Sequence, residues 1–106
     1  MADDRRLKIA RRQLMLAQIA RREARFALAS ALAEEERSSQ IESRARNLLH
    51  EYERRAAKTD ATSQSYALQA NLAFVRSLQT MADNAGEAHK DAKDQSAWQM
   101  QALAKA

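Results

Sequence analysis

Apolar side chains recur along this chain at the three- and four-residue steps of an amphipathic α-helix. One stripe, at steps of four, three and four, consists of Ile41, Ala45, Leu48 and Tyr52. A second stripe with the same steps consists of Phe74, Leu78, Met81 and Ala85. The segment between them, residues 58–65, is dense in small polar residues that favour turns over helix interiors. The pattern predicts a helix, a short turn and a second helix that runs back along the first.

The first helix is expected over about residues 4–57, because neither Gly nor Pro interrupts this span. One heptad register covers almost all of it, with these residues at its a and d positions: Ala10, Gln13, Ala17, Ala20, Ala24, Ala27, Ala31, Glu34, Ser38, Ile41, Ala45, Leu48, Tyr52, Arg55 and Thr59. Because the register continues past Ser38 and Ser39 without a skip, we favour one helix on the order of 80 Å long. A break at these serines, giving a three-helix bundle, is the alternative.

The second helix is expected over about residues 64–104, after a turn at about 58–63, with Thr62 or Ser63 as its cap. One stripe of this helix consists of Leu68, Val75, Leu78, Ala82, Ala85, His89, Ala92 and Leu103. Gly86 is the weak point in its interior, since Gly costs about 1 kcal/mol relative to Ala in a helix.

The composition agrees with a single all-α domain, a long antiparallel two-helix coiled-coil hairpin. The chain has 106 residues, one Gly, no Pro and only 5% aromatic residues, too few for a large globular core. It has no Cys, so disulfides and thiolate metal sites are excluded. The N-terminus lacks an apolar signal core, and no run of about 18 apolar residues is present. We therefore expect a cytoplasmic protein with no direct membrane insertion.

Motifs of catalytic chemistry are missing from the sequence. There is no Gly-rich phosphate loop and no H-E-x-x-H, and His50 and His89 have no further ligand at a metal-binding spacing. A two-helix rod also offers no pocket that excludes water. We expect no enzymatic activity, no cofactor and no metal.

Positive charge is concentrated near the N-terminus. Residues 5–25 contain eight basic side chains and a single acid, Glu23, a net charge of +7. This pattern is typical of a surface that binds an acidic protein, nucleic acid or anionic lipid. It equally fits the solvated face of a helix.

Within this basic stretch, a second apolar group lies on the side of the helix away from the Ala-rich register. It consists of Met15, Ile19 and Phe26, interspersed with Lys8, Arg11, Arg12 and Arg22. A two-helix hairpin has nothing to cover these apolar side chains. A third helix or a homodimer would cover them, but we favour a docking surface for a partner protein, because the chain has little spare helix.

The hairpin resembles the FliJ family of flagellar type III export proteins and its injectisome relative YscO. The resemblance rests on Tyr52 just before the turn, on the element Phe74-Val75-x-x-Leu78 just after it, and on the number of residues between them. It covers roughly residues 5–100. Two features depart from the family: Ile41 and Ala85 stand where polar Gln and His are frequent, and the second helix ends early.

This resemblance implies a rod that sits in the hexameric export ATPase, links it to the cytoplasmic domain of the membrane-embedded export gate, and binds export chaperones. Its location would be cytoplasmic and peripheral, at the inner-membrane export apparatus. The implied gate contacts are Ala45, Leu48, Tyr52, Phe74, Leu78 and Met81. The implied ATPase contacts are Lys8, Arg11, Arg12, Met15, Ile19, Arg22 and Phe26.

Two other functions fit the residues. A generic coiled-coil adaptor would self-associate and cover Met15, Ile19 and Phe26 in a four-helix dimer. A nucleic-acid-binding helix would use the arginines on phosphates. We favour the first over the second and expect no nucleic-acid partner, because residues that read bases are nearly absent among these arginines. For Tyr52 and Phe74, packing across the hairpin is as good an explanation as partner binding.

Overall fold

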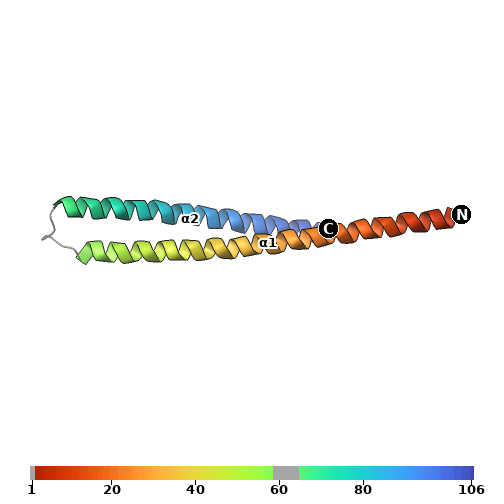
Figure 1. The fold of residues 1–106 in the computed structure, drawn as a ribbon, viewed down its shortest axis with the longest axis horizontal. Helices are drawn as coiled ribbons and strands as arrows, with labels where there is room; N and C mark the ends of the chain where they lie inside the picture. The colour runs from red at the N-terminus through yellow and green to blue at the C-terminus, as the bar shows by residue number, and fades with distance from the viewer. Residues whose placement is uncertain (1, 59–64) are drawn as a thin grey trace.

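The computed structural model of the chain is an antiparallel helical hairpin (Figure 1). It describes residues 2–58 and 65–106, which form α1 (Ala2–Lys58) and α2 (Ser65–Lys105). The described part measures 94 × 15 × 14 Å along its principal axes. The predicted all-α two-helix hairpin is confirmed, with helix ends within two residues of those expected. The predicted caps Thr62 and Ser63 and most of the turn lie outside the described residues.

Helix α1 runs without a break through the serines at which a three-helix bundle was the alternative. It has 57 residues, and Ser38 is buried on the face that packs against α2. Asp3 and Asp4 lie in the first turn, and Arg55 and Lys58 lie in the last. These charges complement the helix dipole at both ends, so the local sequence supports a single long helix.

The apolar core lies toward the closed end of the hairpin. Its buried residues are Leu49, Val75, Leu78 and Ala82, against which Ala45 and Tyr52 pack. At positions 24, 31, 38, 45 and 52 the predicted register of the first helix agrees with the buried face. At the predicted positions between these, such as 41 and 48, the residue that faces α2 is the next one along the chain. Leu49 is 8% exposed, whereas the predicted Leu48 is 40% exposed, so the prediction was wrong by one residue there.

In α2 the long predicted stripe faces α1 from Val75 onward. Val75, Leu78, Ala82 and Ala92 are buried, and Ala85, His89 and Leu103 are partly buried. Leu68, at the start of that stripe, remains exposed. In the shorter stripe Leu78 is buried and Ala85 is partly buried, whereas Phe74 and Met81 are exposed and flank the long stripe beside the core. The side chains facing α1 thus follow a strict three- and four-residue alternation from Val75 to Leu103, as in a coiled coil.

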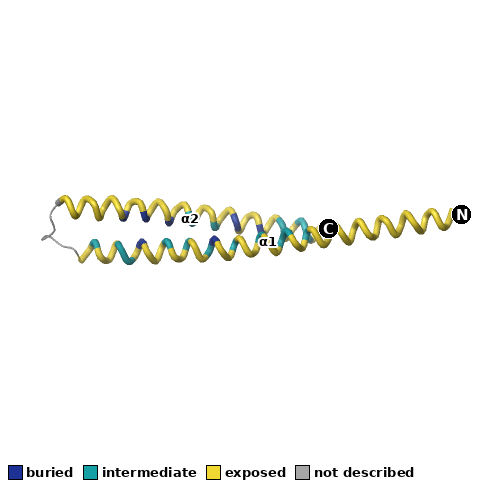
Figure 2. The backbone as a smooth tube through the Cα atoms, in the orientation of Figure 1, coloured by how far each residue is buried: buried dark blue, intermediate teal, exposed yellow. Residues whose placement is uncertain are grey.

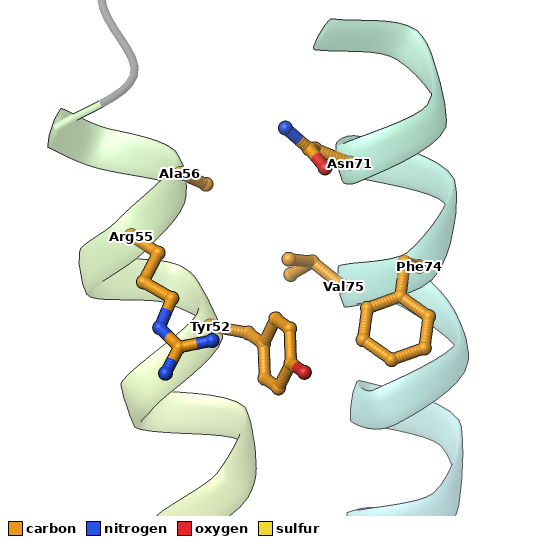
Figure 3. Close-up of a pocket in the computed structure, with 6 residues that line it drawn as sticks. All are labelled: Tyr52, Arg55, Ala56, Asn71, Phe74 and Val75. Carbon is orange, nitrogen blue, oxygen red and sulfur yellow. The ribbon is translucent and has the colours of Figure 1, made fainter. Parts of the chain in front are cut away.

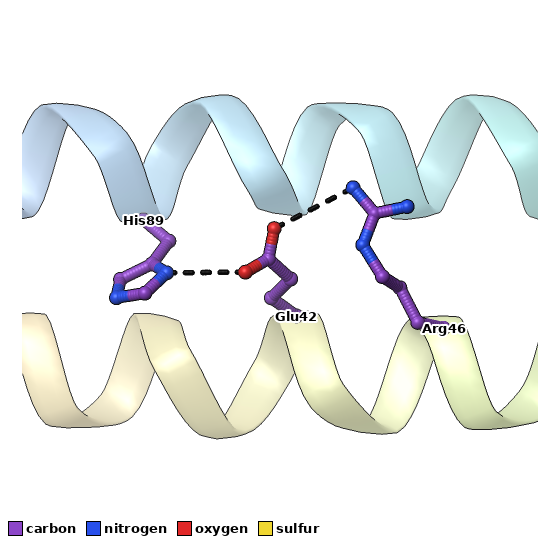
Figure 4. Close-up of polar contacts among 3 residues, drawn as sticks. All are labelled: Glu42, Arg46 and His89. Carbon is purple, nitrogen blue, oxygen red and sulfur yellow. Dashed lines mark hydrogen bonds and ion pairs between the residues drawn. The ribbon is translucent and has the colours of Figure 1, made fainter.

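Polar pairs replace apolar contacts in the middle of the interface. Nδ1 of His89 lies 3.1 Å from Oε1 of Glu42, and the other carboxylate oxygen pairs with Arg46 at 3.5 Å (Figure 4). Farther along, the hydroxyl of Ser96 donates a hydrogen bond of 2.6 Å to Oε2 of Glu35. These bonds satisfy groups that an apolar layer would leave unpaired. The interface is therefore apolar near the turn and polar in its middle.

Gly86 is explained by the same layer. A Cβ atom at this position would lie 2.7 Å from Oε2 of Glu42 and 3.0 Å from a guanidinium nitrogen of Arg46. Helix α2 continues through Gly86 with an ordinary negative φ. The glycine thus leaves room for the Glu42 and Arg46 side chains and does not serve an unusual backbone conformation. It lowers the stability of the helix by roughly 1 kcal/mol relative to Ala.

The N-terminal part of α1 extends beyond the end of α2 (Figure 2). Every residue from 2 to 23 is exposed. We call residues 2–23 the free segment. Within the described ranges, no helix is long and apolar enough to cross a membrane.

Candidate functional site

The closed end of the hairpin carries an open cleft between the two helices (Figure 3). Its volume is about 300 Å³, and it is lined by Tyr52, Arg55, Ala56, Asn71, Phe74 and Val75. The rings of Tyr52 and Phe74 meet edge to face, with centroids 4.8 Å apart. The guanidinium carbon of Arg55 lies 5.1 Å from the centre of the Tyr52 ring. The aromatic pair thus joins the two helices across the hairpin, whereas the cation–π contact lies within α1 and holds the Tyr52 ring in place.

A line of exposed apolar side chains begins at this cleft and follows one edge of the hairpin. It consists of Ile41, Leu48, Phe74 and Met81, which are between 40% and 58% exposed. In the observed register, each of the four residues directly precedes a residue at position a and therefore occupies position g. In an antiparallel coiled coil the g positions of both helices lie on the same side of the interface. We call these four residues the corner flank, a surface to which both helices contribute.

The six gate contacts implied by the family resemblance fall into two groups. Leu48, Phe74 and Met81 belong to the exposed corner flank. Ala45, Tyr52 and Leu78 face the other helix, and Leu78 is only 4% exposed. A protein that docks on the closed hairpin therefore reaches the first group, while the second group supports it from beneath.

At the other end of the molecule, the free segment exposes the apolar side chains predicted to contact an ATPase. Met15 and Ile19 are exposed, and Phe26, just beyond the free segment, is 78% exposed. The basic residues predicted to accompany them are also exposed: Lys8, Arg11, Arg12 and Arg22. On one helix at 100° per residue, these seven side chains share one broad face. The observed helix thus brings the predicted residues onto one face.

Basic side chains cluster at the end of the free segment and just beyond it. Gln18, Arg21, Arg22 and Arg25 surround a shallow hollow of about 350 Å³. A second hollow, of about 190 Å³, is lined by Leu14, Ala17, Gln18, Arg21 and Ala106. The open end thus presents cationic groups beside apolar ones, a combination suited to binding an acidic amphipathic surface.

Acidic and histidine side chains are scattered along residues 2–58 and 65–106. No group of three or more His, Cys, Asp or Glu side chains in these ranges is placed to hold a metal ion. His50 is exposed, and His89 pairs with Glu42 inside the interface.

Sequence reasoning missed part of the corner. It assigned Ile41 to the interior, and it gave no role to Asn71 or Ala56, which line the cleft. The signal that identifies Ile41 as an exposed residue is the heptad itself. Once Leu49 rather than Leu48 is placed at position a, Ile41 and Leu48 both fall at position g.

Comparisons with protein-family models, with curated proteins and with solved structures found no match to this chain. The resemblance to the FliJ family therefore remains a prediction from the residues near the turn.

Proposed function

We propose that this protein is a non-enzymatic component of a flagellar or type III protein export apparatus. It would serve as a coiled-coil stalk and chaperone escort that links the export ATPase hexamer to the cytoplasmic domain of the export gate. Its location would be cytoplasmic, at the periphery of the inner membrane. The proposal joins the resemblance at the turn to the distribution of exposed apolar surface on the rod.

The observation that carries the proposal is the presence of two exposed apolar surfaces near opposite ends of one narrow rod. The corner flank lies beside the turn, and Met15 lies on the free segment. From Met15 to Leu48, α1 rises by about 50 Å at 1.5 Å per residue. A surface at each end of a thin two-helix rod suits a protein that is held by two partners at once. Such a rod has little interior in which to build an enzyme site.

Each surface has the chemistry expected of a protein contact. Contiguous exposed apolar side chains mark interaction sites on soluble proteins, and arginine and aromatic side chains are enriched in interfaces. Phe74 and Met81 provide apolar anchors at the closed end, whereas Met15 and Ile19 are combined with Arg12 at the open end. The two surfaces therefore favour different partners, the gate at the closed end and the ATPase at the open end.

The test is a set of pull-downs from the source cells, with the bound proteins identified by mass spectrometry. The wild type is compared with Phe74→Ala/Met81→Ala and with Met15→Ala/Ile19→Ala. Met15, Ile19 and Met81 are more than 40% exposed, whereas Phe74 also packs on Tyr52, so circular dichroism first checks that each variant keeps the helical hairpin. We expect the first variant to lose the gate subunit and keep the export ATPase, and the second to do the reverse. The variant Tyr66→Ala/Trp98→Ala, changed at exposed aromatic residues outside both surfaces, is the matched control and should keep both partners.

A self-associating adaptor is the second candidate, favoured by the exposure of Met15, Ile19 and Phe26. Sedimentation of the purified chain distinguishes the two. A tight dimer at micromolar concentration that Met15→Ala/Ile19→Ala disrupts, together with pull-downs that contain only the chain itself, would replace the export proposal with the adaptor.

A further inference from the structure

The register that packs α1 against α2 continues into the free segment. In the covered part of α1, the side chains that face α2 at alternating steps of three and four include Ala45, Leu49 and Tyr52. Toward the N-terminus, the same steps of four and three lead first to Leu28 and Ala24. They then reach Arg21, Ala17, Leu14, Ala10 and Leu7. We call Leu7, Ala10, Leu14 and Ala17 the open seam, because they occupy a and d positions on a helix that α2 does not cover.

The end of α2 lies against this open seam. Ala106 lines the 190 Å³ hollow together with Leu14 and Ala17. Beyond that point the seam is exposed, with Leu7 at 49% and Leu14 at 60%. A further helix placed on the open seam would therefore continue the α1·α2 interface in the same register. Alternating Leu and Ala would allow that helix to approach closely, because Ala seams bring helix axes near one another.

The residues beside the open seam determine which helix fits. Its flanking e and g positions include Arg6, Arg11 and Arg25, and no acidic side chain occupies an e or g position between residues 6 and 25. Arg21 stands in the register itself, at the edge of the hollow. Charges at e and g select coiled-coil partners by pairing with opposite charges on the other helix. The open seam therefore favours a helix with Glu or Asp at its flanking positions.

We propose that the open seam binds an acidic amphipathic helix of another protein, which packs end to end with α2 and completes the coiled coil along α1. A second copy of this chain is the less suitable occupant. Pairing residues 5–25 of two copies would bring together two stretches that each contain eight basic residues and one acid. Charges at flanking positions lie closer than the Debye length of about 8–10 Å, so physiological salt screens this repulsion only in part.

The apolar residues of this surface are distinct from those assigned above to an ATPase, and Arg11 borders both. Met15 and Ile19 lie on a different side of the same helix, well away from Leu7 and Leu14 at 100° per residue. The inference holds or fails independently of the export proposal, because it depends only on the register and charge of α1.

The test uses the full 106-residue chain and a fluorescent synthetic peptide about three heptads long, with Leu and Ala at a and d and Glu at e and g. The control peptide is identical except for Lys at e and g. Fluorescence anisotropy measures both affinities at low and at high salt. We expect the Glu peptide to bind, the Lys peptide to bind at least about tenfold more weakly, and the preference to shrink as salt rises.

Two variants of the chain locate the binding face. Leu7→Ala/Leu14→Ala removes the large side chains of the open seam and should weaken binding of the Glu peptide by about tenfold or more. Met15→Ala/Ile19→Ala removes as many exposed apolar side chains from another side of the same segment and should change binding less than about twofold. Ala favours helix at all four positions, so neither variant endangers the fold.

Four results would overturn the proposal. Equal binding of the Lys and Glu peptides would remove the charge argument, and an equal loss in the two variants would remove the open seam as the site. Self-association of the chain that strengthens with salt and disappears in Leu7→Ala/Leu14→Ala would assign the seam to a second copy. Binding of duplex DNA without any binding of the Glu peptide would assign the arginines to phosphate recognition.

Discussion

Two stretches of α1 follow one heptad register, yet only one of them is covered. Near the turn, Leu49 is 8% exposed because α2 packs on it, whereas Leu14, at the equivalent heptad position of the free segment, is 60% exposed. The reason is length: α1 has 57 residues and α2 has 41. The comparison teaches that a heptad pattern specifies a binding surface on a helix without specifying what occupies it.

The two stretches also differ in what their apolar residues contribute to stability. Complete burial of a Leu side chain is worth about 1.5–3 kcal/mol relative to its exposure. Leu78 and Leu49 gain this free energy when the chain folds, and an exposed Leu of the free segment does not. The same substitution should therefore have very different effects in the two stretches.

The largest effect is expected from Leu78→Ala. This side chain is 4% exposed in the core, so its truncation removes buried surface and leaves a gap, and it should lower the free energy of unfolding by about 2–4 kcal/mol. Urea denaturation followed by circular dichroism measures the change. A loss below about 0.5 kcal/mol would mean that the closed end does not carry the stability of the hairpin.

An intermediate effect is expected in the polar middle of the interface. Glu42→Ala leaves His89 without its partner, and because both side chains are partly exposed, we expect a loss of about 1 kcal/mol. Replacing both residues, in Glu42→Leu/His89→Leu, should give a higher melting temperature than Glu42→Ala, because apolar packing avoids the cost of desolvating the pair. Exposed Glu53→Ala is the control, with a change near zero. A double variant that melts below Glu42→Ala would contradict this view of the layer.

The smallest effect is expected from Leu14→Ala in the free segment. The side chain is exposed and Ala favours helix, so the free energy of unfolding should change by less than about 0.5 kcal/mol. The same urea titration measures it. Destabilisation comparable to that of Leu78→Ala would show that the free segment is covered in solution, as in a dimer.

The sequence was sufficient to predict the hairpin, because a long span without Gly or Pro and two apolar stripes around a polar turn favour little else. It was also sufficient to predict the stripe of α2 that faces α1 between Val75 and Leu103. It failed at the alternate positions of α1, where periodicity favoured Ile41 and Leu48 over Glu42 and Leu49. Glu42 lies in the interface opposite Gly86 and His89, and a pattern along one helix contains no information about the other.

The same limit applies to the candidate surfaces. The exposed apolar residues Met15, Ile19 and Phe26 could be predicted, because a two-helix hairpin leaves one side of each helix uncovered. Leu48, Phe74 and Met81 of the corner flank were among the contacts implied by the resemblance, but the sequence did not separate them from buried Leu78. Ile41 was missed because its exposure depends on which of two adjacent residues enters the core. The open seam could not be recognised either, since it requires knowing where α2 ends relative to α1.

The layer around Glu42 has a mechanical consequence for a rod held at both ends. A pull along the axis on the free segment loads the interface in shear, and apolar contacts alone would allow the helices to slip by one heptad, about 10 Å. Such a slip would place the Glu42 carboxylate opposite a residue with a side chain instead of Gly86 and would part it from His89. A polar residue at a single interface position is known to fix the register of coiled coils. This layer would therefore resist sliding of one helix along the other, so that the distance between the two ends stays constant under load.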